Sequence, residues 1–281
     1  MKQRSEMPSI YAYNDFRKYL AVYQAARMAT EKNFTKSEFS RQLDLPNTRS
    51  YFNDVLKGKT VTGTFIERFI RVIGFSREEA QFFRTLVRFN QADSVEEREL
   101  SFTQLIDLNR TPGRILTKKM LEYYGNWYNS VLRALLEIED FRDDFPALVR
   151  KIRPTISVPQ AKKAVALLLE LGLVEKKPDG TLKPSDKAIR APELFRNELI
   201  RHYQLEVLSL TREKMAGTPE DITFSFTNTI SLSERGWRRL QTLADKFRSQ
   251  VRSLVHKDEE RADRVVQLAL VLTNLTNREK S

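Results

Sequence analysis

Apolar side chains recur at helical spacing through most of residues 9–89. The pattern predicts five helices, at about 9–26, 35–43, 47–57, 65–73 and 78–89. Asn14 or Asp15 is a candidate N-cap of the first helix. Thr35, with Glu38 three residues later, indicates a capping box at the start of the second. We therefore expect a small helical domain at the beginning of the chain.

The second and third of these helices are short and lie on either side of the polar turn Asp44-Leu45-Pro46. Proline cannot continue a helix, because it lacks the N–H and its ring collides with the preceding turn. Two short helices joined by a tight turn are the pattern of a helix-turn-helix, whose second helix can enter the major groove of DNA. Residues 1–92 are thus predicted to form a DNA-binding domain.

The residue pattern of the third predicted helix indicates which side chains would contact DNA. Apolar residues account for its buried side, and polar residues remain for the other. Arg49 and Asn53 are the types that best make paired hydrogen bonds to base edges. The smaller and basic side chains suit phosphate contacts, namely Thr48, Ser50, Lys57 and Lys59.

A connector is expected at 93–117, followed by a second module at 118–190. Helices are predicted at 118–136, 145–152 and 158–171, and Pro178-Asp179-Gly180 is a hairpin turn signal between two short strands. Helix, helix, long helix and hairpin is the order of a winged helix. Its candidate secondary contacts to nucleic acid are Lys162, Lys163, Lys176 and Lys177. A docking or dimerisation module with a solvated basic rim explains these lysines equally well.

The last third has a different pattern. One long helix is predicted at 191–215, and a second helix at 233–255 with Ser233 as its cap. Residues 221–232 and 264–275 alternate apolar and polar positions, which is typical of strands. Residues 191–281 are therefore predicted to be a small α/β domain for dimerisation or sensing, whose sheet a partner subunit could share. The whole chain is expected to be mainly α.

Composition adds a basic bias to this picture. The formal net charge is +11, and residues 1–90 hold 16 Lys/Arg against 9 Asp/Glu. An excess of this kind over a helix-turn-helix fits binding to phosphates, although a generic solvated surface also accounts for it. No apolar run approaches the roughly 20 residues of a membrane helix, and no signal peptide is apparent, so a cytoplasmic protein is expected.

Residues for enzymatic chemistry are scarce. The chain has no cysteine, which excludes disulfides and thiolate sites, and only two histidines, His202 and His256. The phosphate-binding glycine motifs and the nucleophile elbow are also missing from the sequence. The aromatic residues at 123–128 are at helical spacing and are interpreted as core or interface. We expect no enzyme, catalytic residue, metal or cofactor.

Several motifs resemble known families. The segment from the second predicted helix through LKGKTVTGTFIERFIRVIGFS resembles the lambda-repressor-like helix-turn-helix module, except that Asp44 stands where that module usually has glycine. Asp tolerates a left-handed backbone better than most residues. YNDFRKYL, LVRFNQA, YYGNWY and LLLELGLVEKKPDGTL are together similar to a paralogous bacterial family of helix-turn-helix transcriptional regulators with a C-terminal domain of unknown function.

The sequence therefore favours a transcriptional regulator that binds double-stranded DNA as a homodimer, with no effector ligand identified. The alternative is a protein-interaction module that retains the helix-turn-helix fold without binding DNA. That alternative is supported by Asp44, by Asp54 and by a net basic excess that is modest for 281 residues.

Overall fold

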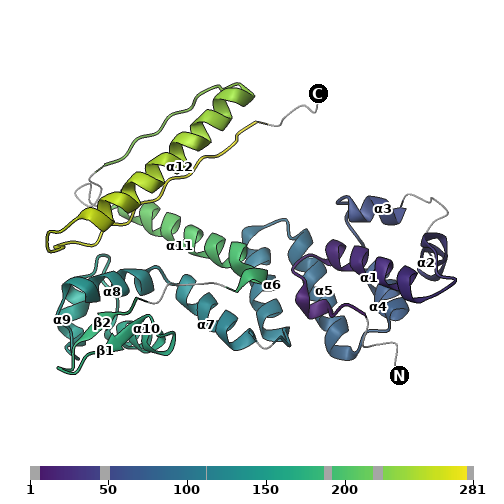
Figure 1. Ribbon diagram of the computed structural model, residues 1–281, viewed down its shortest axis with the longest axis horizontal. Helices are drawn as coiled ribbons and strands as arrows, with labels where there is room; N and C mark the ends of the chain where they lie inside the picture. Colours follow the sequence, from purple (N-terminus) through teal and green to yellow (C-terminus); the bar gives the residue numbers. More distant parts are fainter. Residues whose placement is uncertain (1–6, 45–50, 112, 187–191, 218–223, 277–281) are drawn as a thin grey trace. The chain divides into compact units, whose positions relative to one another are not determined.

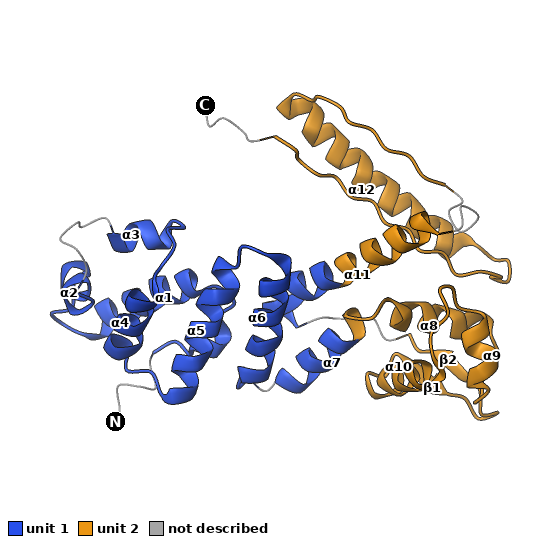
Figure 2. Ribbon diagram, turned by 180° about the vertical axis from the view of Figure 1, so that it is seen from behind, with its two compact units in different colours: residues 1–122, 190–202 blue, residues 123–189, 203–281 orange. Residues whose placement is uncertain are grey.

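The computed structural model describes residues 7–44, 51–111, 113–186, 192–217 and 224–276 (Figure 1). The described chain is mainly helical, with one two-stranded sheet. It divides into two compact units, residues 1–122 with 190–202 and residues 123–189 with 203–281 (Figure 2). The elements of these ranges are η2 (Ile10–Ala12), α1 (Phe16–Thr30), α2 (Lys36–Gln42), α3 (Tyr51–Leu56), α4 (Gly63–Ile73), α5 (Arg77–Gln91), α6 (Val95–Leu108), α7 (Arg114–Tyr124), α8 (Trp127–Ile138), α9 (Phe145–Arg150), α10 (Val158–Glu170), β1 (Val174–Lys176), β2 (Leu182–Pro184), η3 (Glu193–Phe195), α11 (Arg196–Ala216) and α12 (Glu234–Lys257).

The first unit is built around buried aromatic rings. Phe39 of α2 is fully buried, and its ring centroid lies 5.3 Å from that of Phe52 on α3 and 5.9 Å from that of Phe69 on α4. The ring of Tyr23 on α1 lies 6.2 Å from Phe39 on another side. Rings at this separation attract one another beyond their burial. Phe39 therefore joins α1, α2, α3 and α4 into one core.

Helix boundaries in this unit follow their caps closely. The side chain of Asp15 accepts from Arg17 N, and the side chain of Thr35 accepts from Glu38 N, as predicted. Gly74 ends α4 with a left-handed φ of 71°. The capping box at Thr35 is only half present, because the Glu38 carboxylate instead accepts from Arg41 and Gln42. A stronger charged partner has drawn that carboxylate away from the backbone.

The predicted connector at 93–117 contains a regular helix, α6, that packs on α5. Ser94 caps it by accepting from Glu97 N, and Glu96 and Glu97 occupy its first turn. Acidic residues stabilise a helix N-terminus, where the backbone dipole is positive. The acidic residues near the beginning of the predicted connector are therefore the start of a helix.

In the second unit, three helices precede a hairpin. Ser157 forms a complete capping box with Gln160 at the start of α10, and β1 pairs antiparallel with β2, Glu175 opposite Lys183. The helix expected at 118–136 is two helices, α7 and α8, separated at Gly125 and Asn126. Glycine and asparagine are poor helix formers, and the broad apolar pattern had concealed the interruption.

The end of the chain corrects one prediction. Ser233 caps α12 by accepting from Gly236 N, as expected. The flanking segments predicted as strands are extended, but over their described residues, 224–233 and 258–276, they form no sheet. A strand exists only where another strand satisfies its backbone hydrogen bonds. Over its described residues, this region is therefore a helix between two extended segments that form no β-ladder, and the predicted α/β sheet is absent from those residues.

Candidate nucleic-acid interface

The turn after α2 has a left-handed backbone at Asp44, with φ of 47°. Most residues avoid this region because Cβ collides with the following carbonyl, and Asp is one of the exceptions. Arg68 of α4 fastens the turn: its guanidinium donates to the Asp44 carbonyl and lies 3.0 Å from the Asp44 carboxylate. The departure from glycine at this position is therefore accommodated, and a basic residue of the next helix supports it.

α3 is held against the unit by three aromatic and aliphatic contacts. Phe52 and Val55 are buried, and the ring centroid of Tyr51 lies 5.4 Å from that of Phe65 on α4. A helix of six residues is too short to be stable by itself. Its position depends on this packing.

Arg17 of α1 provides the polar part of that attachment. Its Nε donates to the Val55 carbonyl at 2.9 Å, and Nη2 donates to the carbonyls of Gly58 and Lys59 at 3.2 and 3.3 Å. The last carbonyls of a helix lack partners within the helix, and a cation at that end also suits the dipole. Sequence reasoning missed Arg17 and Arg68; the only signal for Arg17 was its place in the motif YNDFRKYL.

The predicted contact residues divide between described and undescribed parts of the chain. Thr48, Arg49 and Ser50 lie outside the described residues. Asn53, Lys57 and Lys59 are described. Asn53 is exposed on α3, on the side away from the buried Phe52 and Val55, and both lysines are exposed just after the helix.

Lys59 makes two contacts with α3. Lys59 Nζ lies 4.3 Å from the ring centroid of Tyr51, a cation–π contact that returns the chain toward the start of α3. The Lys59 amide also donates to the Asp54 carbonyl at 2.9 Å. Lys59 is therefore held beside α3, the helix that also carries the exposed Asn53.

The candidate secondary contacts lie in the second unit. Lys162 and Lys163 are exposed on α10, and Lys162 Nζ lies 5.7 Å from the ring centroid of Phe145. Lys176 and Lys177 are exposed at the end of β1, but Lys177 forms an ion pair with Glu175. Hydrogen bonding to Glu175 raises the pKa of Lys177. The charge of this lysine is thus partly compensated within the hairpin.

Basic side chains also fasten the hairpin to α8. Arg133 donates to the carbonyls of Leu173 and Ser185, at 3.4 and 3.1 Å. Lys183 lies 2.9 Å from the Asp140 carboxylate, and this hydrogen bond lowers the pKa of Asp140. Asp179 in the turn accepts from Thr181, and Gly180 supplies a φ of 84°. The predicted turn is correct, and the hairpin is set on its helix by two cations that sequence reasoning had not singled out.

Three further side chains singled out from the sequence are packed or paired. Tyr123 is buried, and the ring of Tyr124 lies 5.2 Å from it and 5.8 Å from Tyr203. Burial raises the pKa of the Tyr123 hydroxyl. His202 Nδ1 lies 3.1 Å from Glu99 Oε1. These contacts agree with the interpretation of the aromatic group as core.

Across the described ranges, no three His, Asp or Glu side chains converge in a way that could hold a metal ion. Among the helices of those ranges, none has an apolar stretch long enough to cross a membrane. Over the described residues, the structure thus defines a mainly helical protein with one small hairpin and, in its first unit, a short helix on which Asn53 is exposed.

Comparison with known families identifies a family that matches the larger part of the chain. Residues 109–275 match the family described as "Domain of unknown function (DUF4423)", and the chain belongs to this family. The match agrees with the expected C-terminal domain of unknown function, and it covers α7 through α12 as one stretch. A search of curated proteins found no match, and a search of solved structures found none either.

Proposed function

We propose that the protein is a transcriptional regulator that binds double-stranded DNA through α2 and α3 and acts as a homodimer. The observation that carries this proposal is the attachment of α3. Arg17 holds one end of the α3 segment and Arg68 holds the turn after α2, while Asn53 remains exposed. Preorganised support of this kind is what a recognition helix needs to keep its register in the groove.

Charge supports the same proposal. Residues 1–90 have seven more basic than acidic residues, 16 against 9. Lysines that contact phosphates release counterions from DNA, so binding weakens as salt rises. Asn53 and Arg49 are assigned to base edges. Thr48, Ser50, Lys57 and Lys59 are assigned to phosphates.

The experiment is fluorescence anisotropy of the full chain with mixed duplex DNA over a series of salt concentrations, followed by selection of bound sequences from random DNA. On the selected site, Asn53→Ala should weaken binding about 5- to 150-fold, or about 1–3 kcal/mol, and relax the preference at one position. Lys57→Ala and Lys59→Ala should each weaken binding to all duplexes similarly. Each should also reduce the slope of log affinity against log salt concentration by about one. The matched controls are Asn197→Ala on α11 and Lys18→Ala on α1, because both residues are exposed. Neither variant should change the affinity for DNA or its dependence on salt.

The second unit is assigned an assisting role within the same proposal. The order α8, α9, α10, β1, β2 is that of a winged helix, and its exposed lysines are Lys162, Lys163, Lys176 and Lys177. The double variant Lys162→Ala, Lys163→Ala should reduce the salt slope if α10 contacts phosphates. An unchanged slope would assign this unit to docking or dimerisation.

A protein-interaction module without DNA binding is the second candidate. It is favoured by Asp44, whose carboxylate is largely exposed beside the turn, and by Asp54 on α3. The two candidates differ at low salt, where a true DNA binder has its highest affinity. Absence of binding to any duplex at low salt would establish the interaction module.

A further inference from the structure

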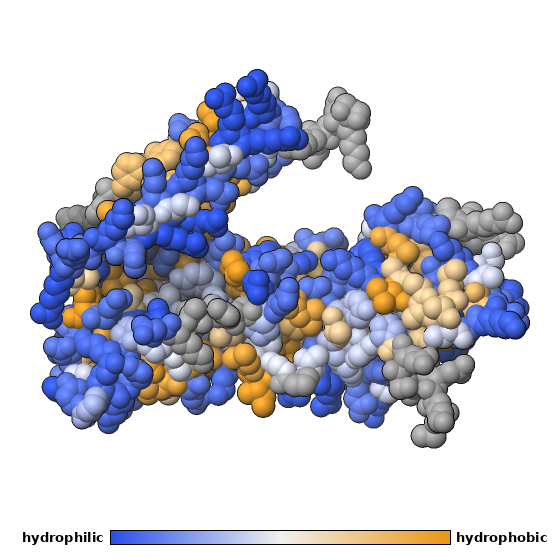
Figure 3. All heavy atoms as spheres, in the orientation of Figure 1, coloured by the Kyte–Doolittle hydropathy of each residue, from blue (hydrophilic) through white to orange (hydrophobic). Residues whose placement is uncertain are grey.

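Exposed large apolar side chains are concentrated in residues 224–276. These residues hold fifteen of the twenty-five in the described chain, and none of the 53 residues is buried. Figure 3 shows orange side chains among the blue ones over the part that carries α12. Ordering a backbone costs about 1–2 kcal/mol per residue, which burial normally offsets. A region with no buried residue lacks that compensation within the single chain.

The segment 224–233 has the alternation of a strand with one covered face. Phe224, Phe226, Ile230 and Leu232 occupy alternate positions, and serine or threonine occupies most positions between them. Phe224 and Phe226 are 81% and 68% exposed. Successive side chains of a strand point to opposite faces, so one face of this segment is apolar and nothing in the described chain buries it.

The segment 264–275 is apolar on both faces. Val266, Leu268, Leu270 and Leu272 lie on one face, and Val265 and Val271 lie on the other. Val266 is 74% exposed. A strand with apolar residues on both faces is typical of the inside of a sheet that is covered from two sides.

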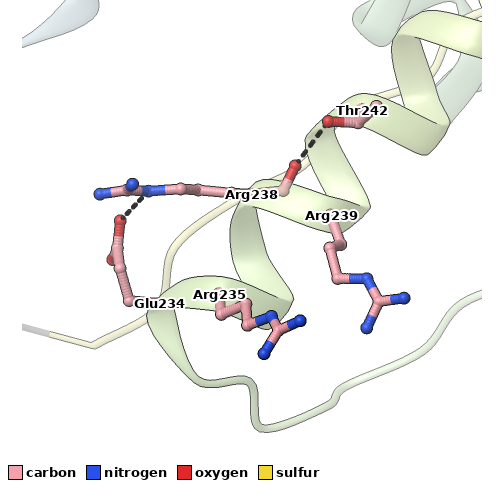
Figure 4. Close-up of a pocket in the computed structure, with 5 residues that line it drawn as sticks. All are labelled: Glu234, Arg235, Arg238, Arg239 and Thr242. Carbon is pink, nitrogen blue, oxygen red and sulfur yellow. Dashed lines mark hydrogen bonds and ion pairs between the residues drawn. The ribbon is translucent and has the colours of Figure 1, made fainter.

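α12 has a matching apolar stripe. Trp237, Leu240, Ala244, Phe247, Val251 and Leu254 follow one another at intervals of three and four residues. The other side is polar: Figure 4 shows Arg235 and Arg239 directed to one side of the helix, and Arg238 paired with Glu234 at 3.0 Å. The helix of 24 residues is about 36 Å long, and a strand of ten residues spans about 33 Å. Each extended segment is thus long enough to lie along the whole stripe.

We propose that this region is half of a domain completed by a second copy of the chain. Segments 224–233 and 264–275 of the two copies pair in one shared sheet, and the two α12 helices cover it with their apolar stripes. The pairing supplies the backbone hydrogen bonds that neither segment has as a β-ladder in the described chain. The inference specifies the dimer that the proposed function includes, but it is based on residues outside α2 and α3.

The absence of charge identifies the partner as another copy. Segment 224–233 contains no Lys, Arg, Asp or Glu, and the only one in 264–275 is Arg264 at its first position, although 30% of the whole chain is charged. Free strand edges are normally protected by charges, lysine above all. An uncharged strand meets no repulsion from its own copy, and a two-fold interface places the same surface on both sides.

The amount of apolar surface also fits a dimer. A stable interface buries about 800 Å² per partner and involves about 20–30 residues a side. The fifteen exposed apolar side chains, together with the half-exposed Trp237, Leu240 and Val251, approach that number. Pairing the two segments within one chain would not suffice, because one helix covers only one face and 264–275 is apolar on both.

The first test is sedimentation equilibrium of the full chain in the absence of DNA. We expect a dimer, and an increase in its dissociation constant of about 100-fold for Phe226→Asp and for Leu270→Asp. The matched control is Thr227→Asp, which adds the same charge to the opposite face of the same segment and should change the constant less than about threefold. Unchanged far-UV circular dichroism of the full chain excludes global unfolding of the variants.

The second test uses the absence of cysteine, since any single introduced cysteine can form a disulfide only with its counterpart in another copy. Cysteines are placed one at a time through 224–233 and 264–275 and oxidised. We expect rapid covalent dimers at positions near the two-fold axis of one segment, because directly opposed Cβ atoms are about 4.5–5.5 Å apart. Lys18→Cys on α1 should form no covalent dimer.

The inference is overturned by a chain that is monomeric at 100 µM, or by a dimer that withstands both aspartate substitutions and forms no cross-link in either segment. Its failure is separate from that of the proposed function. A chain that dimerises as described but binds no duplex retains this inference and loses the function. A chain that binds DNA as a monomer loses this inference and retains only the DNA-binding part of the proposed function.

Discussion

The guanidinium of Arg17 on α1 donates to the carbonyl of Val55 in the last turn of α3, with 2.9 Å between Nε and the oxygen. The same guanidinium also donates to the carbonyls of Gly58 and Lys59, which follow α3. It lies 4.4 Å from the ring centroid of Phe16, so it is also oriented by its neighbour. One side chain of the first helix therefore fixes the end of the helix that we assign to DNA.

Arg17→Ala should loosen α3 without unfolding the unit. Hydrogen bonds to a charged group contribute about 1.5–3 kcal/mol, so the local opening of α3 should become about 10-fold or more frequent. Amide hydrogen exchange resolved by peptide, over α3 and over α5, measures the effect. Lys18→Ala, next to it on an exposed position, is the control. Equal loss of protection in α3 and α5 would show that Arg17 supports the whole unit and not α3 in particular.

Asp44 tests how the turn after α2 is stabilised. At φ of 47° an alanine should cost about 1 kcal/mol relative to aspartate, because its side chain cannot bond locally. Glycine removes the steric cost but also loses the Arg68 pair, so Asp44→Gly should stay within about 0.5 kcal/mol of the wild type. Urea unfolding, followed by hydrogen exchange in α2 and α4, ranks the stability of the wild type and the two variants. Alanine more stable than glycine would contradict the left-handed turn.

Local signals accounted for much of the fold. Residue type and spacing predict caps at Asn14 or Asp15, at Thr35 and at Ser233. Asp15, Thr35 and Ser233 each accept the expected backbone hydrogen bond. Caps are predictable because the donor and the acceptor lie within three residues of one another. The turn at Pro178-Asp179-Gly180 and the end of α4 at Gly74 are local in the same sense.

What sequence reasoning missed depends on distant residues. The sequence predicts a connector where α6 lies, because the acidic first turn dominates the pattern. Phe102, Leu105 and Ile106 of this helix are nevertheless buried. Arg17 and Arg68 could not be assigned, because their acceptors lie 38 and 24 positions away. The strands expected at 221–232 and 264–275 need hydrogen-bond partners that the described chain does not supply. Of the predicted contact residues, Asn53, Lys57 and Lys59 are exposed as expected.

Phe39 is the centre of the core that carries α2 and α3. It is fully buried against Tyr23, Phe52 and Phe69, so Phe39→Ala should lower the free energy of unfolding of the first unit by about 3–5 kcal/mol. Phe39→Leu keeps much of the volume and should cost less than half as much. Hydrogen exchange over α1 to α5 during urea unfolding is the measurement. A cost below about 1 kcal/mol for alanine would mean that the rings pack independently of Phe39.

Acid should destabilise the first unit through two arginine–glutamate pairs. Hydrogen bonds from Arg27 lower the pKa of Glu31, and hydrogen bonds from Arg84 lower the pKa of Glu67, both from 4.5. A carboxyl whose pKa is lowered by folding adds stability above its unfolded pKa, and this stability is lost as pH falls through the folded value. Unfolding free energy should therefore stay level from about pH 7 to pH 5 and decline below about pH 4.5.

The glutamates can be separated from the rest of that decline. The double variant Glu31→Gln, Glu67→Gln should begin less stable than the wild type at pH 7, by no more than about 1 kcal/mol per pair because both pairs are partly exposed. The two curves should converge as pH falls below about 4, where the wild-type carboxylates are also neutral. Because Arg27 and Arg84 hold their charge at every pH in this range, curves that remain parallel to pH 3 would show that neither carboxylate contributes.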